Sequence, residues 1–150
     1  MRRQLGVLFI VAMLAGCAMG REASRQTVSV DAQPPPGLAR VIFFRPSRSA
    51  LFLRDAQISV NGRSACVLSN GDAFAYDVAP GELAIVAKNW EDLLGARSAS
   101  LAVDSGKIYF VQIAAERAIP LSTWFSVTPV DGRPAAADFS YSVVNLCKAS

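Results

Sequence analysis

Three cysteines and a group of arginines are the residues of this chain with the most distinctive chemistry. The cysteines are Cys17, Cys66 and Cys147, and the arginines are Arg45, Arg48 and Arg54. A cysteine can form a disulfide, bind a metal or carry a lipid, and an arginine pairs two-pronged with phosphate or carboxylate. The chain of 150 residues has no histidine. That excludes the commonest general base, the commonest zinc ligand and every histidine-based catalytic triad.

Cys17 ends a segment with the layout of an export signal. Met1-Arg2-Arg3 is basic, and Leu5 to Ala15 forms an apolar stretch of about eleven residues, which is typical of a secretory signal. A membrane-spanning helix needs roughly twenty apolar residues, so the stretch is too short for a permanent anchor. Leu14-Ala15-Gly16-Cys17 resembles the bacterial lipobox, in which the cysteine is lipidated and the chain is cut before it. We therefore expect residues 1–16 to be a cleaved lipoprotein signal peptide and Cys17 to carry the lipid.

The expected lipid places the protein in the bacterial cell envelope. Two or three acyl chains on Cys17 would hold it firmly to a membrane. Ala18 occupies the position where an aspartate commonly retains such lipoproteins at the inner membrane. The resemblance therefore favours a periplasm-facing protein of the outer membrane. Loss of Arg2 and Arg3 with the signal takes the 15 basic residues to 13, against 12 acidic ones, and a charge near +1 gives no reason to expect a nucleic-acid partner.

With Cys17 lipidated, Cys66 and Cys147 remain as an even pair in an oxidising compartment. They either form a disulfide or stay as two partly exposed thiols, since both fall among the polar alternates of their expected strands. No metal site or cofactor is expected.

The mature chain divides into a tether and one domain. Residues 17–37 are polar, lack periodicity and end in Pro34-Pro35-Pro36-Gly37, which predicts a flexible, then proline-stiffened tether. The alternative is a first strand through Thr27 to Val30. From residue 38 to 150, short β-like runs alternate with turn signals, which predicts a small antiparallel β-sandwich. A short helix after Pro134 is the one helical expectation.

Individual runs predict particular strands and turns. Leu38 to Arg45 is rich in β-branched and aromatic residues and is expected to be a strand buried on both faces. Asn61-Gly62 predicts a tight hairpin that places Ile58, Val60, Ala65 and Val67 on one face. Another hairpin is expected between 98–103 and 107–114, around Asp104-Ser105-Gly106.

Two stretches, "GLARVIFFRP" and "ISVNGRSACVLSNGDAFAYDVAPGELAIVA", resemble the bacterial domain-of-unknown-function family numbered 2846. The likeness covers about Gly37 to Glu116 and consists of a strand ending in Arg-Pro, an Asn-Gly hairpin and a Pro-Gly turn. It implies a small lipoprotein and supplies no activity, cofactor or catalytic residue. Members commonly have a histidine where this chain has Leu83.

The sequence favours a binding or scaffolding module over an enzyme, with no catalytic residues predicted. Arg45, Arg48 and Arg54 are the predicted binding residues, because guanidinium groups beside Leu51 and Phe52 suit an anionic envelope ligand or an acidic envelope protein. The alternative is an ordinary loop with solvated arginines. Two other functions stay open, an envelope hydrolase and a carrier of a small apolar ligand; the carrier predicts a cavity between the sheets.

Overall fold

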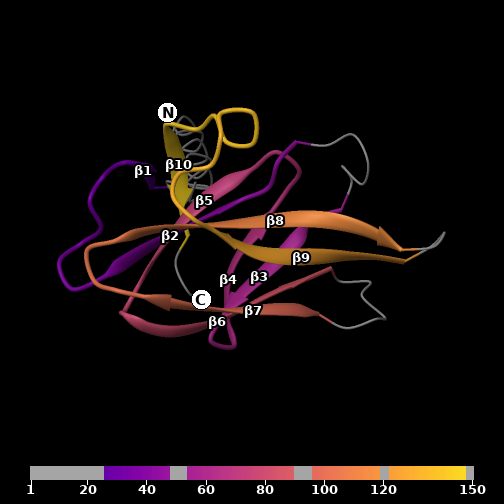
Figure 1. The fold of residues 1–150 in the computed structure, drawn as a ribbon, viewed down its shortest axis with the longest axis horizontal. Coiled ribbons are helices and arrows are strands. Elements are labelled where there is room, and N and C mark those ends of the chain that lie inside the picture. The colour runs from indigo at the N-terminus through magenta and orange to yellow at the C-terminus, as the bar shows by residue number, and fades with distance from the viewer. Residues whose placement is uncertain (1–25, 48–53, 90–95, 119–121, 148–150) are drawn as a thin grey trace, which may run out of the picture.

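A computed structural model describes residues 26–47, 54–89, 96–118 and 122–147 of the chain (Figure 1). These residues form ten strands and no helix, which confirms the all-β prediction. The strands are β1 (Thr27–Ser29), β2 (Ala39–Phe44), β3 (Ala56–Val60), β4 (Arg63–Leu68), β5 (Ala73–Val78), β6 (Gly81–Lys88), β7 (Arg97–Val103), β8 (Ile108–Ala118), β9 (Ser122–Val130) and β10 (Val143–Leu146). The signal peptide, Cys17 and Arg48 lie outside the described residues.

The strands form two sheets of unequal width. The larger sheet has six strands in the order β1-β10-β5-β2-β8-β9, and the smaller has four in the order β4-β3-β6-β7. Most neighbours are antiparallel, but β10 runs parallel to β5 and β2 runs parallel to β8. In Figure 1 the long β8–β9 hairpin extends to one side of the molecule, and β1 and β10 lie at the other.

Strand β2 lies at the centre of the fold and is buried on both faces, as predicted. Ala39, Val41 and Phe43 point into the core between the two sheets. Ile42 and Phe44 point to the opposite face of the larger sheet, where a second core forms around Phe139, Val30 and Val144. A strand that contacts apolar layers on both sides has no polar alternation, which is why its sequence reads as a continuous apolar run.

The predicted Asn61-Gly62 hairpin is present and joins β3 to β4. Asn61 and Gly62 both have positive φ, 50° and 77°, as a tight two-residue turn requires. The Asn61 side-chain oxygen also accepts a hydrogen bond of 2.8 Å from the Ala84 backbone N–H, which attaches the turn to β6.

The hairpin predicted around Asp104-Ser105-Gly106 is wrong in its pairing, although its strands are present. β7 pairs with β6 in the smaller sheet, while β8 pairs with β2 and β9 in the larger one. The turn between them therefore crosses from one sheet to the other. Backbone hydrogen bonds from Gly106 N–H to the Leu38 carbonyl (2.8 Å) and from Arg40 N–H to the Lys107 carbonyl (3.0 Å) attach the start of β8 to β2.

The predicted tether is wrong for residues 26–37, which belong to the folded domain. Thr27 to Ser29 form β1, which pairs antiparallel with β10, and Val30 is fully buried in the second core. An Nη1–H of Arg40 donates a hydrogen bond of 3.0 Å to the Ala32 carbonyl. Besides local turns, hydrogen bonds join this segment to β10, more than a hundred residues away, and to the buried Arg40, so its own composition gives little sign of order.

The helix expected after Pro134 is also wrong. The N–H groups of Asp138 and Phe139 both bond to the Ala135 carbonyl, at 2.9 and 3.0 Å, which makes a single turn. This turn places Phe139 against Phe44 and Phe110 in edge-to-face contacts, with ring centroids 5.3 and 5.6 Å apart. These aromatic contacts cover the outer face of the larger sheet. The turn therefore serves to position Phe139 and does not continue as a helix.

Candidate functional site

A β-bulge in β4 determines which way Cys66 points. Ile58 pairs with Cys66 and the next residue, Ser59, pairs with Ser64, so Ala65 is an extra residue in β4. The extra residue shifts the side-chain alternation by one position beyond it. As a result Leu68 is buried and Val67 is 56% exposed, so the predicted inward position of Val67 is wrong.

The shift turns Cys66 toward Cys147, and the structure has the disulfide that the sequence left open. The two Cα atoms are 5.9 Å apart, within the usual span of a disulfide. Cys147 follows β10, and its backbone N–H bonds to the Ala75 carbonyl at 2.9 Å. The bridge therefore joins the edge strand of the smaller sheet to the parallel β10–β5 pair of the larger sheet.

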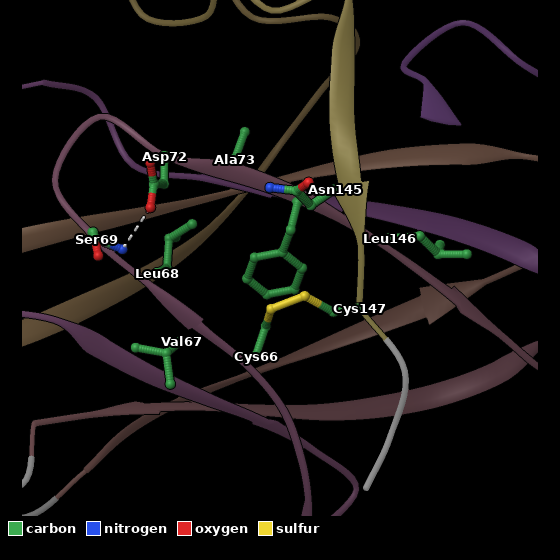
Figure 2. A pocket seen from close by; sticks show the side chains of 10 residues that line it. Cys66, Val67, Leu68, Ser69, Asp72, Ala73, Asn145, Leu146 and Cys147 are labelled. Atoms are coloured by element: carbon green, nitrogen blue, oxygen red, sulfur yellow. Dashed lines mark hydrogen bonds between the residues drawn. A yellow bond between two sulfur atoms is a disulfide. The ribbon is translucent and has the colours of Figure 1, made fainter. Parts of the chain in front are cut away.

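A groove of about 420 Å³ lies beside this bridge, where β4, β5 and β10 meet (Figure 2). We call it the disulfide groove. Its lining combines the bridge with apolar side chains and three polar ones: Cys66, Val67, Leu68, Ser69, Asp72, Ala73, Phe74, Asn145, Leu146 and Cys147. Figure 2 shows Asp72 and Asn145 along one rim and Val67 and Cys66 along the other.

The unequal width of the two sheets explains why a groove forms at this position. β4 is an edge strand of the smaller sheet and contacts β5, the third strand of the larger sheet. β10 and β1 lie beyond β5 in the larger sheet. Val143 and Asn145 alternate with the buried Val144 on β10, and both are exposed. The face of β10 that carries them is therefore open to solvent.

Asp72 is the one formally charged residue among those lining the groove. Its carboxylate accepts a hydrogen bond of 3.3 Å from the Ser69 backbone N–H. Burial raises the pKa of the Tyr141 phenol, and the nearby Asp72 carboxylate raises that pKa further. The groove thus offers a carboxylate, an amide and a hydroxyl beside apolar side chains, which suits a ligand with hydrogen-bond donors and a positive charge.

The predicted arginine site is not assembled as expected. Arg45 is only 2% exposed, so the expectation that it presents a guanidinium to an anionic ligand is wrong. Its Nη1–H groups donate to the carbonyls of Arg54 and Leu68, and the guanidinium lies 5.0 Å from the centre of the Phe125 ring. Burial lowers the pKa of Arg45, and the carboxylates of Asp55 and Asp72 oppose this lowering.

The inward direction of Arg45 follows from β-strand alternation. Ala39, Val41 and Phe43 point between the sheets, and Arg45 is the next residue of the same parity. Its backbone N–H continues the ladder by bonding to the Asp72 carbonyl at 2.9 Å. The alternation of inward and outward side chains, with a period of two residues, is present in the sequence. The positive charge of Arg45, however, is typical of a surface residue. Arg54 is half-buried, and Arg48 lies outside the described residues.

Among the described residues, no group of three or more histidine, cysteine, aspartate or glutamate residues is placed to hold a metal ion. In the same residues no helix is long and apolar enough to cross a membrane. Comparison of the chain with protein-family models and with curated proteins finds no match, and the resemblance to the family numbered 2846 stays a prediction.

Proposed function

We propose that this protein is a lipid-anchored, periplasm-facing component of the bacterial cell envelope, held at the outer membrane by Cys17. Its β-sandwich acts as a binding or scaffolding module, and the disulfide groove is its binding surface. The bridge between Cys66 and Cys147 carries the proposal, because stable disulfides belong to oxidising compartments outside the cytosol. The lipobox-like sequence points independently to export, and it shares no residue with the bridge.

The groove supports binding in preference to a purely structural role for the domain. Asp72 and Asn145 are exposed along its rim, and Phe74 and Leu68 are buried beside them. Sites that bind small molecules or peptide segments commonly combine an apolar lining with a few placed polar groups.

Mass spectrometry of the N-terminal peptide from membranes tests the anchor. The expected result is a peptide that begins at Cys17 and carries a diacylglyceryl group, and Cys17→Ser should abolish both the lipid and membrane retention. A mature protein that is recovered free of membrane with an unmodified Cys17 thiol would contradict the anchor.

A photocrosslinking amino acid at position 145 tests the binding surface in living cells. The same amino acid at Thr128, which is exposed on β9 at the opposite edge of the larger sheet, provides the matched control. We expect a discrete adduct from position 145 and none from position 128. Equal labelling from both positions would remove the groove as the binding surface.

A further inference from the structure

The chain enters the folded domain at the rim of the disulfide groove. The Gln26 carbonyl accepts a hydrogen bond of 2.7 Å from the Leu146 N–H, and Thr27 lies opposite Asn145 in the β1–β10 ladder. Leu146 and Asn145 both line the groove. Any segment that precedes Gln26 is therefore attached to the molecule beside the groove.

The segment between the proposed anchor and this entry point is short. Nine residue steps separate Cys17 from Gln26, and at about 3.5 Å per residue they span at most about 30 Å. A folded domain of this size has a diameter of roughly 35 Å. A fully extended segment is thus no longer than the domain itself, so the lipid on Cys17 holds the entry point, and the groove beside it, within about 30 Å of the bilayer.

The exposed apolar side chains lie at the same end. Val67 and Val143, at 56% and 52%, are the two large hydrophobic residues exposed among the residues that the structure describes. Val67 lines the groove, and Val143 lies two residues before Asn145 on the same face of β10. An exposed apolar residue needs no explanation by itself, but these two belong to β4 and β10, the strands that border the groove where the chain enters the domain, which favours this end as a contact surface.

The charge of this end selects among lipid surfaces. Asp72 is exposed and is the one charged residue of the groove lining, whereas the Arg45 guanidinium, which bonds to the Leu68 carbonyl and interacts with Asp72, is buried. A carboxylate repels the phosphate of a purely anionic lipid and attracts an ammonium group, and Asn145 and Ser69 add hydrogen-bond acceptors for the ammonium protons. The chemistry therefore fits an ammonium-bearing phospholipid headgroup.

From these observations we propose that the groove end, defined by Val67, Asp72, Val143 and Asn145, is a membrane-docking face. The two valines contact the interfacial region of the bilayer, and Asp72 faces ammonium headgroups. The proposal rests on the lipid anchor of the proposed function, which fixes the attachment point. It adds an orientation of the domain and a preferred lipid class.

The test uses the full lipidated protein reconstituted in vesicles of phosphatidylethanolamine and phosphatidylglycerol. Ser29→Cys places a fluorophore on β1 opposite Val143 and leaves both valines intact. Thr128→Cys places the same fluorophore at the opposite edge of the same sheet. Because the thiol of Cys17 is capped by lipid and the other two cysteines are bridged, the introduced thiol is the one that reacts.

With nitroxide-labelled lipid as the quencher, we expect quenching several-fold stronger at position 29 than at position 128. Combined Val67→Ser and Val143→Ser substitutions should reduce the quenching at position 29 toward the value at 128. Equal quenching at the two positions overturns the docking face. Protection of position 29 from a soluble quencher, without quenching by lipid, would indicate a second copy of the chain on this face and also overturns it.

Vesicle composition tests the headgroup class. Quenching at position 29 should fall several-fold in vesicles of phosphatidylglycerol alone, and Asp72→Asn should narrow the difference between the two compositions. Stronger contact with pure phosphatidylglycerol overturns the ammonium preference. Mass spectrometry and flotation of the same samples separate the two proposals. Protein that carries no lipid and fails to float with the vesicles contradicts the anchor. Lipidated protein that floats but shows equal quenching at positions 29 and 128 contradicts only the docking face.

Discussion

Arg40 and Asp77 face each other across β2 and β5 in a two-pronged ion pair inside the protein. The Nε–H and an Nη2–H of Arg40 bond to the two Asp77 carboxylate oxygens at 2.7 and 2.9 Å. The two side chains are 4% and 11% exposed. The third guanidinium nitrogen of Arg40, Nη1, donates to the Ala32 carbonyl. Arg40 therefore connects the centre of the larger sheet to the segment that follows β1.

Removal of either partner of this pair should destabilise the domain strongly. Asp77→Ala leaves the Arg40 guanidinium buried without its counter-charge, and such changes cost roughly 3–5 kcal/mol. Equilibrium denaturation in urea measures the loss. Lys107→Met provides the control, because it breaks an ion pair of the same 2.7 Å length whose partners are both exposed, and it should leave the unfolding midpoint unchanged. The combined Arg40→Met and Asp77→Val variant should recover most of the stability. If the loss of unfolding free energy in the combined variant equals the sum of the losses in the two single variants, a direct interaction between Arg40 and Asp77 is contradicted.

Loss of the disulfide should lower stability without changing the fold. Cys66 and Cys147 are separated by 81 residues, and a bridge over a loop of this length contributes about 4.5 kcal/mol in the chain-entropy description. Thermal unfolding of a combined Cys66→Ala and Cys147→Ala variant, compared with wild type in the presence and absence of reductant, measures the effect. If reductant leaves the unfolding temperature of the wild-type protein unchanged, the bridge does not constrain the unfolded chain.

Arg45 should contribute more to stability than Arg54, because Arg45 is buried and Arg54 is half-buried. Arg45→Met removes charged hydrogen bonds to the carbonyls of Arg54 and Leu68, and hydrogen bonds of this kind contribute about 1.5–3 kcal/mol. Arg54→Ala keeps its own backbone carbonyl, so the bond from Arg45 survives and the loss of stability should be smaller than that of Arg45→Met. Chemical denaturation of the two variants side by side checks this, and equal losses would argue against the buried role of Arg45.

Tyr141 should ionise at a higher pH than an ordinary tyrosine. Its pKa is raised from about 10 by burial and then by the Asp72 carboxylate. The folded state therefore favours the neutral phenol. This contribution to stability is complete below the unfolded pKa and is lost as the pH rises through the folded one.

Ultraviolet difference titration of wild type against Tyr141→Phe isolates this phenol from Tyr76 and Tyr109. Asp72→Asn should move the midpoint part of the way back toward the ordinary value. A wild-type titration midpoint equal to that of an ordinary tyrosine would contradict the effect of burial and of Asp72 on the pKa of Tyr141.

Local sequence determined the features whose physics is local. Asn61-Gly62 predicts its hairpin because both residues accept positive φ, and the apolar run of β2 predicts a strand with apolar layers on both faces. In each case the signal and the structure that it specifies lie within a few residues of each other.

Tertiary structure decided the pairings and the directions of side chains. β8 lies beside β2 and not beside β7, because the hydrogen bonds that fix its start come from Leu38 and Arg40. The bulge at Ala65 exists only in the pairing of β4 with β3, yet it turns Cys66 toward Cys147. The buried guanidinium of Arg45 donates hydrogen bonds to the carbonyls of Arg54 and Leu68 and lies over the Phe125 ring. Hydrogen bonds and ion pairs between residues far apart in the chain leave no local pattern, so only the folded arrangement specifies them.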